Sequence, residues 1–193
     1  MKRCLSLMML FVISLSLSGC SKTTVKWNGK TEEMASLLMV SDITNLYEYV
    51  GIVDYVFIGT VKEIEHNVIP NKIKQHEDSY SEYRIMVDEN LKGNLVSEIS
   101  CRKMGGFRKD GTMLLVSAEV PGGRMILDNG LPEVGKQYIF LAYAQPDGSL
   151  TLSEIFDARE YDEDLLTEYI DYVNNEIPYE RERFSSMYDA NNN

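Results

Sequence analysis

The sequence predicts a mainly β domain with a short helix at its N-terminal end and an amphipathic helix at its C-terminal end. Segments rich in β-branched and aromatic residues recur between residues 55 and 155, and turn residues separate them. Residues 83–91 alternate apolar and polar side chains, which is typical of a half-buried strand in an antiparallel sheet. Residues 162–177 instead repeat apolar side chains at helical spacing behind a run of acids.

The N-terminus has the pattern of a secretory signal. A basic dipeptide at residues 2–3 precedes an apolar stretch over residues 4–17, which is too short to cross a bilayer as a helix of about 20 residues. From its last residue, Leu17, the sequence continues as Leu-Ser-Gly-Cys, which resembles the lipobox of bacterial lipoproteins. The resemblance implies a diacylglyceryl thioether on Cys20 and cleavage between Gly19 and Cys20. The alternative is an ordinary secretory signal in which Cys20 occurs by chance.

These features divide the chain into four parts. We expect a signal peptide over 1–19, a lipidated cysteine and polar tether over 20–41, a single domain over 42–184 and a frayed tail over 185–193. The mature monomer would keep Cys20 and Cys101. Because Cys20 would carry lipid, no internal disulfide could form, and the core would have to stabilise the domain. Cys101 shares the parity of an apolar neighbour, which favours a buried small hydrophobe over a reactive thiol.

The domain begins with a helix and a long strand. We expect the helix over residues 42–52, with Asp42 as its N-cap. The strand follows from residue 54 toward residue 64 and is buried on both faces at its start. Gly59 within it indicates a bulge or a sharp bend.

The later elements follow from turn signals and spacing. A loop over residues 67–79 precedes the alternating strand, and further strands are expected over 96–102, 113–120, 124–127, 138–144 and 149–155. The last helix presents Leu166, Tyr169, Ile170 and Val173 as one stripe, and Pro178 stops it. We expect this stripe, Ile170 included, to pack against the domain itself rather than to dock another protein.

Three segments resemble the netrin-like module, the OB-type barrel of the tissue inhibitors of metalloproteinases. They read VDYVFIGTVKEIE from residue 53, YRIMVDENLKGN from residue 83 and LPEVGKQYIFLAY from residue 131. The resemblance covers some 90 residues and implies an OB-like antiparallel β-barrel of five or six strands. Bacterial surface lipoproteins with the same strand order would be closer relatives.

The inhibitory chemistry of that family does not carry over to this chain. The inhibitors depend on disulfides and chelate the target's zinc through an N-terminal cysteine. The matching residue here would be Cys20, whose sulfur is expected to carry lipid at the membrane. A tether of about 20 residues also separates it from the barrel. The resemblance therefore assigns no functional residue to this chain.

Composition and motifs argue against several function classes. The 193 residues are 44% hydrophobic and 25% charged, with a net charge of −11, which argues against a nucleic acid as partner. His66 and His76 lie near several acids, but their spacing does not force three ligands to converge, and a solvated loop is favoured. The acidic run over 154–171 lacks an EF-hand pattern, and no nucleophile elbow or phosphate loop occurs. We expect no catalytic, metal or cofactor residue, and hence no enzyme.

The expected function is that of a membrane-anchored binding module on the extracytoplasmic face of a bacterial cell. Its barrel would bind an unknown protein or glycan through a strand face and the loops over 67–79 and 103–112. Tyrosines such as Tyr80 and Tyr83, which flank the second strand, suit a binding surface as well as a core. The alternative, by resemblance, is a protease inhibitor or modulator that presents the 67–79 loop with Pro70.

Overall fold

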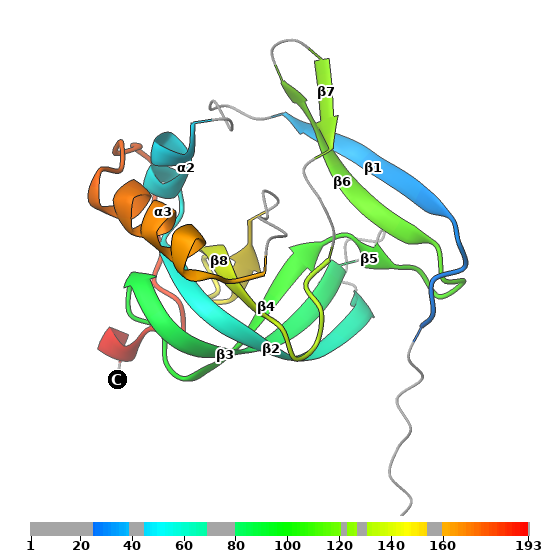
Figure 1. The fold of residues 1–193 in the computed structure, drawn as a ribbon, viewed down its shortest axis with the longest axis horizontal. Coiled ribbons are helices and arrows are strands. Elements are labelled where there is room, and N and C mark those ends of the chain that lie inside the picture. Colours follow the sequence, from blue (N-terminus) through cyan, green and yellow to red (C-terminus); the bar gives the residue numbers. More distant parts are fainter. Residues whose placement is uncertain are drawn as a thin grey trace, which may run out of the picture.

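The structure is a computed structural model that describes residues 25–38, 45–68, 80–120, 123–126, 131–153 and 160–192. Within these ranges the protein is mainly β, with a closed five-stranded barrel, a second small sheet and two α-helices (Figure 1). The predicted signal peptide, Gly19 and Cys20 lie outside the described residues. Among the described residues, no helix is long and apolar enough to cross a membrane.

Five strands close into the barrel. They are β2 (Tyr55–Val68), β3 (Tyr80–Lys92), β4 (Glu98–Met104), β8 (Gln137–Ala144) and β9 (Leu150–Leu152). Their order around the ring is β2-β3-β4-β9-β8, and β8 pairs with β2 to close it. The predicted OB-like barrel with a short N-terminal helix and a C-terminal amphipathic helix is confirmed.

One strand pair departs from the predicted antiparallel arrangement. Strands β4 and β9 run parallel, whereas the other four neighbouring pairs are antiparallel. A ring with an odd number of strands cannot alternate direction at every pair, so two strands of equal direction must meet once. The barrel is therefore mixed, and its closure accounts for the difference from the prediction.

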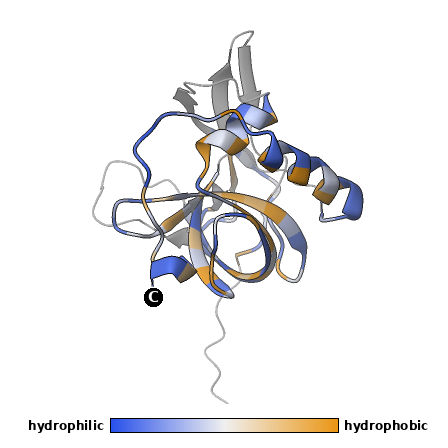
Figure 2. Cartoon of the chain, turned by 90° about the vertical axis from the view of Figure 1, so that its left-hand side faces the viewer, coloured by the Kyte–Doolittle hydropathy of each residue, from blue (hydrophilic) through white to orange (hydrophobic). Residues whose placement is uncertain are grey.

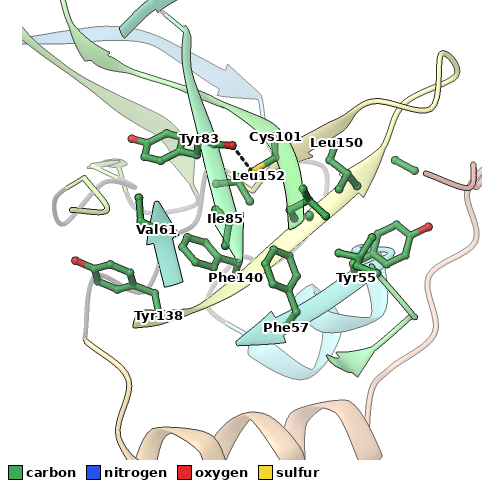
Figure 3. Close-up of a cluster of buried hydrophobic side chains, with 14 residues drawn as sticks. Tyr55, Phe57, Val61, Tyr83, Ile85, Cys101, Tyr138, Phe140, Leu150 and Leu152 are labelled. Atoms are coloured by element: carbon green, nitrogen blue, oxygen red, sulfur yellow. Dashed lines mark hydrogen bonds between the residues drawn. The ribbon is translucent and has the colours of Figure 1, made fainter. Parts of the chain in front are cut away.

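The barrel interior is filled by side chains of alternate strand positions (Figure 3). Phe57 and Phe140 stack there with their ring centroids 5.5 Å apart. Cys101 is 1% exposed, and its thiol donates to the carbonyl oxygen of Tyr83 at 3.7 Å. Cys101 is thus the buried small hydrophobe that the sequence predicts. The register of β2 against β3 shifts between Ile58 and Gly59, where the extra residue is Asp88 of β3, so the strand pair is irregular at the predicted position. An added Cβ at Gly59 would lie 2.5 Å from the side chain of Ile85.

Two helices cover the outer face of β2 and β8. They are α2 (Leu46–Ile52) and α3 (Glu163–Asn174). The second core contains Tyr49, Val50, Leu165 and Tyr169 from the helices and Val56, Ile58, Ile139 and Leu141 from the strands. Because β2 and β8 are buried on both faces here, their sequences read as unbroken apolar runs instead of alternating. Figure 2 shows hydrophobic residues concentrated on the barrel strands, with hydrophilic ones along the outer side of α3.

The two helices differ from the sequence prediction at particular residues. Asn45 caps α2, its side chain accepting from the backbone N–H of Tyr47 at 3.2 Å, whereas the predicted cap Asp42 lies outside the described residues. In α3 the buried positions are Leu165 and Tyr169. Ile170, expected in the buried stripe, is 42% exposed, because it lies about 100° around the helix from Tyr169.

A second sheet combines an N-terminal strand with three strands that lie in the chain between β4 and β8. It contains β1 (Thr31–Leu38), β5 (Gly106–Phe107), β6 (Met113–Val120) and β7 (Gly123–Ile126). Strand β1 pairs parallel with β6, so part of the predicted tether over 20–41 is a strand. Asn28 holds it in place, because its side chain donates to the carbonyl oxygen of Asp110 at 3.0 Å and to Oγ1 of Thr112 at 3.1 Å. The sequence pattern misses β1 because its partner is remote in the chain.

The segment that follows α3, residues 175–192, is called the C-terminal segment and crosses the outside of the barrel. The sequence predicts a frayed tail over 185–193, but residues 185–192 pack against the domain. Val96 donates its N–H to the carbonyl oxygen of Tyr188 at 2.9 Å, and Ser186 is fully buried. Leu95 and Asp189 form an antiparallel bridge. Backbone hydrogen bonds hold this polar segment against the domain, and such bonds cannot be predicted from amino-acid composition.

Candidate functional site

A pocket of about 410 Å³ lies on the outer surface of the barrel, and we call it the β8–β9 pocket. Strands β3, β4 and β9 form its floor, and the turn that joins β8 to β9 forms one wall. Its lining residues are Tyr80, Arg102, Gln145, Pro146, Asp147, Ser149 and Thr151. Most of these residues carry a polar group, and they include one aromatic ring and one cation.

Strand parity places Arg102 in this pocket. Its neighbours Cys101 and Lys103 are buried, so the side chain between them lies on the opposite, outer face of β4. Arg102 is paired in register with Thr151 of β9, which also lines the pocket. The parallel β4–β9 pair thus forms the floor of the pocket.

The β8–β9 turn is fixed by its own hydrogen bonds. The carboxylate of Asp147 accepts from the backbone N–H of Ser149 at 3.0 Å and from its hydroxyl at 2.6 Å. Gly148 adopts a φ of 80°, which favours glycine, and donates its N–H to the carbonyl oxygen of Gln145 at 2.8 Å. The C-terminal segment supports the turn from behind, because Met187 donates its N–H to the carbonyl oxygen of Gly148 at 2.8 Å. The wall of the pocket is therefore preorganised.

The two charged side chains of the pocket, Asp147 and Arg102, differ in their hydrogen bonding. Two hydrogen bonds from Ser149 lower the pKa of the Asp147 carboxyl, the hydroxyl bond being the larger cause, and the positive charge of Arg102 contributes. Asp147 is therefore ionised at neutral pH. Arg102 itself makes no salt bridge or side-chain hydrogen bond to any residue that the structure describes. Its guanidinium is available to a ligand.

The neighbouring charges on the same face are already paired. Arg84 lies two register positions along β3 from the residue that pairs with Arg102, forms an ion pair with Glu63 and lies 3.8 Å from Glu98. The hydroxyl of Ser100 donates to the carboxylate of Glu82 at 2.5 Å. Arg102 thus differs from Arg84, although both are arginines on the outer face of adjacent strands.

The structure brings together some of the residues predicted to bind and separates others. Tyr80 lines the β8–β9 pocket, whereas Tyr83 is a fully buried core residue. Residues 69–79 of the predicted binding loop lie outside the described residues. The other predicted loop, over 103–112, contains the buried Lys103 and the strand β5 and does not line this pocket. The sequence shows the segment 145–149 as a turn but gives no sign that it borders a site.

The predicted position in a solvated loop is wrong for His66. The sequence places it in a solvated loop, but it lies at the end of β2, where its Nδ1 is 2.8 Å from the hydroxyl oxygen of Ser81. The extension of β2 beyond the predicted strand brings it there. His76 lies outside the described residues.

Two observations concern the cysteine and the metal-ligating side chains of the described residues. Burial, as the main cause, raises the pKa of the Cys101 thiol well above its ordinary value, so the nucleophilic thiolate does not form. The described residues contain no group of three His, Cys, Asp or Glu side chains that could hold a metal ion. No protein-family model matches the chain, and a search of curated proteins gave no significant match.

Proposed function

We propose that this protein is a non-enzymatic binding module and that the β8–β9 pocket holds its ligand, a glycan. The observation that carries the proposal is the guanidinium of Arg102, which has no ion-pair or hydrogen-bond partner among the described residues and lies beside a rigid, hydroxyl-bearing turn. OB-type barrels bind oligonucleotides and oligosaccharides on the face of their second and third strands, beside the loop between the last two. The pocket occupies that place here, between β3, β4 and the β8–β9 turn, an analogy at the level of the fold.

The charge of the protein favours an oligosaccharide over an oligonucleotide as the ligand. A net charge of −11 opposes the polyanionic backbone of an oligonucleotide. A sugar suits the lining better, because Gln145, Ser149 and Thr151 can exchange hydrogen bonds with its hydroxyl groups. The ring of Tyr80 offers an apolar surface for a sugar face, and Arg102 suits an acidic substituent. We therefore favour a glycan over the protein partner that the sequence leaves open.

A glycan array tests this proposal with the full chain. We expect binding to acidic envelope glycans, and we expect Arg102→Ala and Tyr80→Ala each to weaken it about tenfold or more. Arg84→Ala is the matched control, since it removes an arginine from the same face whose charge is already paired. Equal binding by Arg102→Ala and Arg84→Ala would refute the proposal. Absence of glycan binding, with an envelope protein captured only when Arg102 is intact, would replace the glycan by a protein ligand.

We further propose that the protein is anchored through lipid on Cys20 at the extracytoplasmic face of a bacterial cell membrane. Support comes from the basic start, the short apolar stretch and the Leu-Ser-Gly-Cys sequence that ends at Cys20. Cys20→Ala should take up no labelled fatty acid and should accumulate as precursor, because the thiol that accepts the lipid is gone. Cys101→Ala is the control and should be labelled normally. Lipid labelling of the Cys20→Ala variant would contradict the proposal.

A further inference from the structure

A second pocket, of about 440 Å³, lies where the end of β2 meets the second sheet, and we call it the His66 pocket. Its walls are largely apolar and include Ile64, Phe107, Met113, Leu131 and Pro132. It shares no residue with the β8–β9 pocket. Its volume falls in the range typical of small-molecule sites.

A hydrogen-bond chain fixes the tautomer of His66 at this pocket. The hydroxyl oxygen of Ser81 lies 2.9 Å from the carbonyl oxygen of Gly105 and 2.8 Å from Nδ1 of His66. A carbonyl oxygen only accepts, so the single hydroxyl proton of Ser81 must point to Gly105. The hydroxyl oxygen then accepts from His66, which places the imidazole proton on Nδ1. In the neutral ring, Nε2 is left as an acceptor.

The surroundings favour the neutral ring and hold its orientation. Burial lowers the pKa of His66 below its ordinary value. The ring of Phe107 packs edge-on against it, with centroids 5.1 Å apart and planes at 84°. Gly106 has a φ of 120°, and an added Cβ there would lie 2.0 Å from the hydroxyl oxygen of Ser81. The Gly105-Gly106 pair therefore permits the Ser81 bond that sets the tautomer.

The polar side chains of this pocket are acceptors. Nε2 of His66 has no hydrogen-bond partner among the described residues. Glu133, at the rim, carries a carboxylate that accepts from Lys136 at 3.3 Å. A carboxylate or phosphate would meet two acceptors and an apolar wall. A neutral molecule with a donor would satisfy Nε2 and bury its apolar body.

We propose that the His66 pocket binds a small, mainly apolar molecule that carries one hydrogen-bond donor, such as a phenol, with the donor on Nε2 of His66. This site goes beyond the proposed glycan site and does not depend on it. The ring of the ligand lies against Phe107 and Met113, where aromatic and thioether groups give favourable contacts.

The test titrates the full chain with phenol, toluene and benzoate and follows the side-chain nitrogen resonances of its two histidines. Toluene has nearly the shape of phenol but no donor, and benzoate adds a negative charge. We expect phenol to shift the Nε2 resonance of His66 and to bind about three- to tenfold more tightly than toluene, as one hydrogen bond allows. Benzoate should bind more weakly than both.

Two variants locate the effect. His66→Phe keeps an aromatic ring but removes the acceptor, so phenol should lose its advantage over toluene. Arg102→Ala alters the other pocket and should leave the phenol affinity unchanged. The proposal is overturned if phenol binds no more tightly than toluene, if benzoate binds as well as phenol, if Nε2 does not shift on saturation or if no probe binds. These wild-type measurements test the His66 pocket even if His66→Phe fails to fold. If the glycan proposal fails, the phenol measurements still test this site independently.

Discussion

The half-buried histidine His66 should make the protein less stable in acid. Burial lowers its pKa in the folded state, whereas in the unfolded chain the imidazole titrates near about 6.5. Below pH of about 6.5 the unfolded state therefore binds more protons, and stability is lost as the pH falls toward the folded-state pKa. Well above pH of about 6.5 the imidazole is neutral in both states, so His66 gives the stability no pH dependence there.

Urea unfolding of the wild type and of His66→Phe at several pH values between 7.5 and 5 measures this effect. Groups other than His66 are the same in both proteins, so the difference between the two curves isolates His66. We expect the wild type to lose more stability than the variant over this interval. Parallel curves would show that His66 can take up a proton in the folded state without cost.

At the scale of the element, α3 shows which side of an amphipathic helix contributes to stability. Leu165 is 1% exposed and contacts the core that lies outside β2 and β8, whereas Ile170 is 42% exposed. Leu165→Ala should cost about 2–5 kcal/mol, because it removes buried methyl groups and leaves a cavity. Ile170→Ala is the matched control and should cost well under half of that, since much of its side chain already contacts water.

Denaturant unfolding of the full chain distinguishes the two variants by their midpoints. Equal losses would mean that Ile170 is covered in solution by something other than the described residues. No loss for Leu165→Ala would mean that α3 is not docked on the barrel.

The sequence predicts some elements well because their signals are local. The alternation over 83–91 corresponds to β3, and the acids before residue 165 correspond to the N-terminus of α3, where Asp162 accepts from the N–H of Leu165 at 2.8 Å. Pairings between remote segments leave no such signal. Strand β1 depends on β6, and the position of Arg102 beside the β8–β9 turn depends on the closed ring. The candidate site is therefore a product of topology, and from the sequence only Tyr80 could be proposed for it.

At the scale of the whole molecule, the C-terminal segment connects the helices to the barrel through two arginines. Arg183 donates to the carbonyl oxygen of Gly51 at 2.6 Å and to that of Val53 at 3.2 Å, at the C-terminal end of α2, where a cation is favourable. Arg181 donates to the carbonyl oxygen of Ile52 at 2.8 Å. Without this segment these carbonyl groups would need other partners.

Both arginines also converge on one buried carboxylate. The side chain of Asp54 is 7% exposed, lies 2.5 Å from the guanidinium of Arg181 and lies 3.1 Å from that of Arg183. It accepts the backbone N–H of Ala144 at 2.9 Å, so it joins the end of β8 to the C-terminal segment. Removing the cationic partners of such a buried carboxylate destabilises the fold strongly, because the remaining charge is buried and uncompensated.

The last prediction follows from this shared carboxylate. Replacing Arg181 and Arg183 together by Ala should cost about 3 kcal/mol, near the lower end of the range for breaking a buried pair, because Arg183 is 39% exposed. Asp54→Ala should cost a similar amount. The triple variant should lose much less than the two losses added together, because both changes remove the same interaction. Glu180→Ala and Glu182→Ala, at exposed neighbours, should stay within about 0.5 kcal/mol of the wild type. Denaturant unfolding of these variants measures the cycle, and strictly additive losses would show that the C-terminal segment stabilises the fold through other contacts than Asp54.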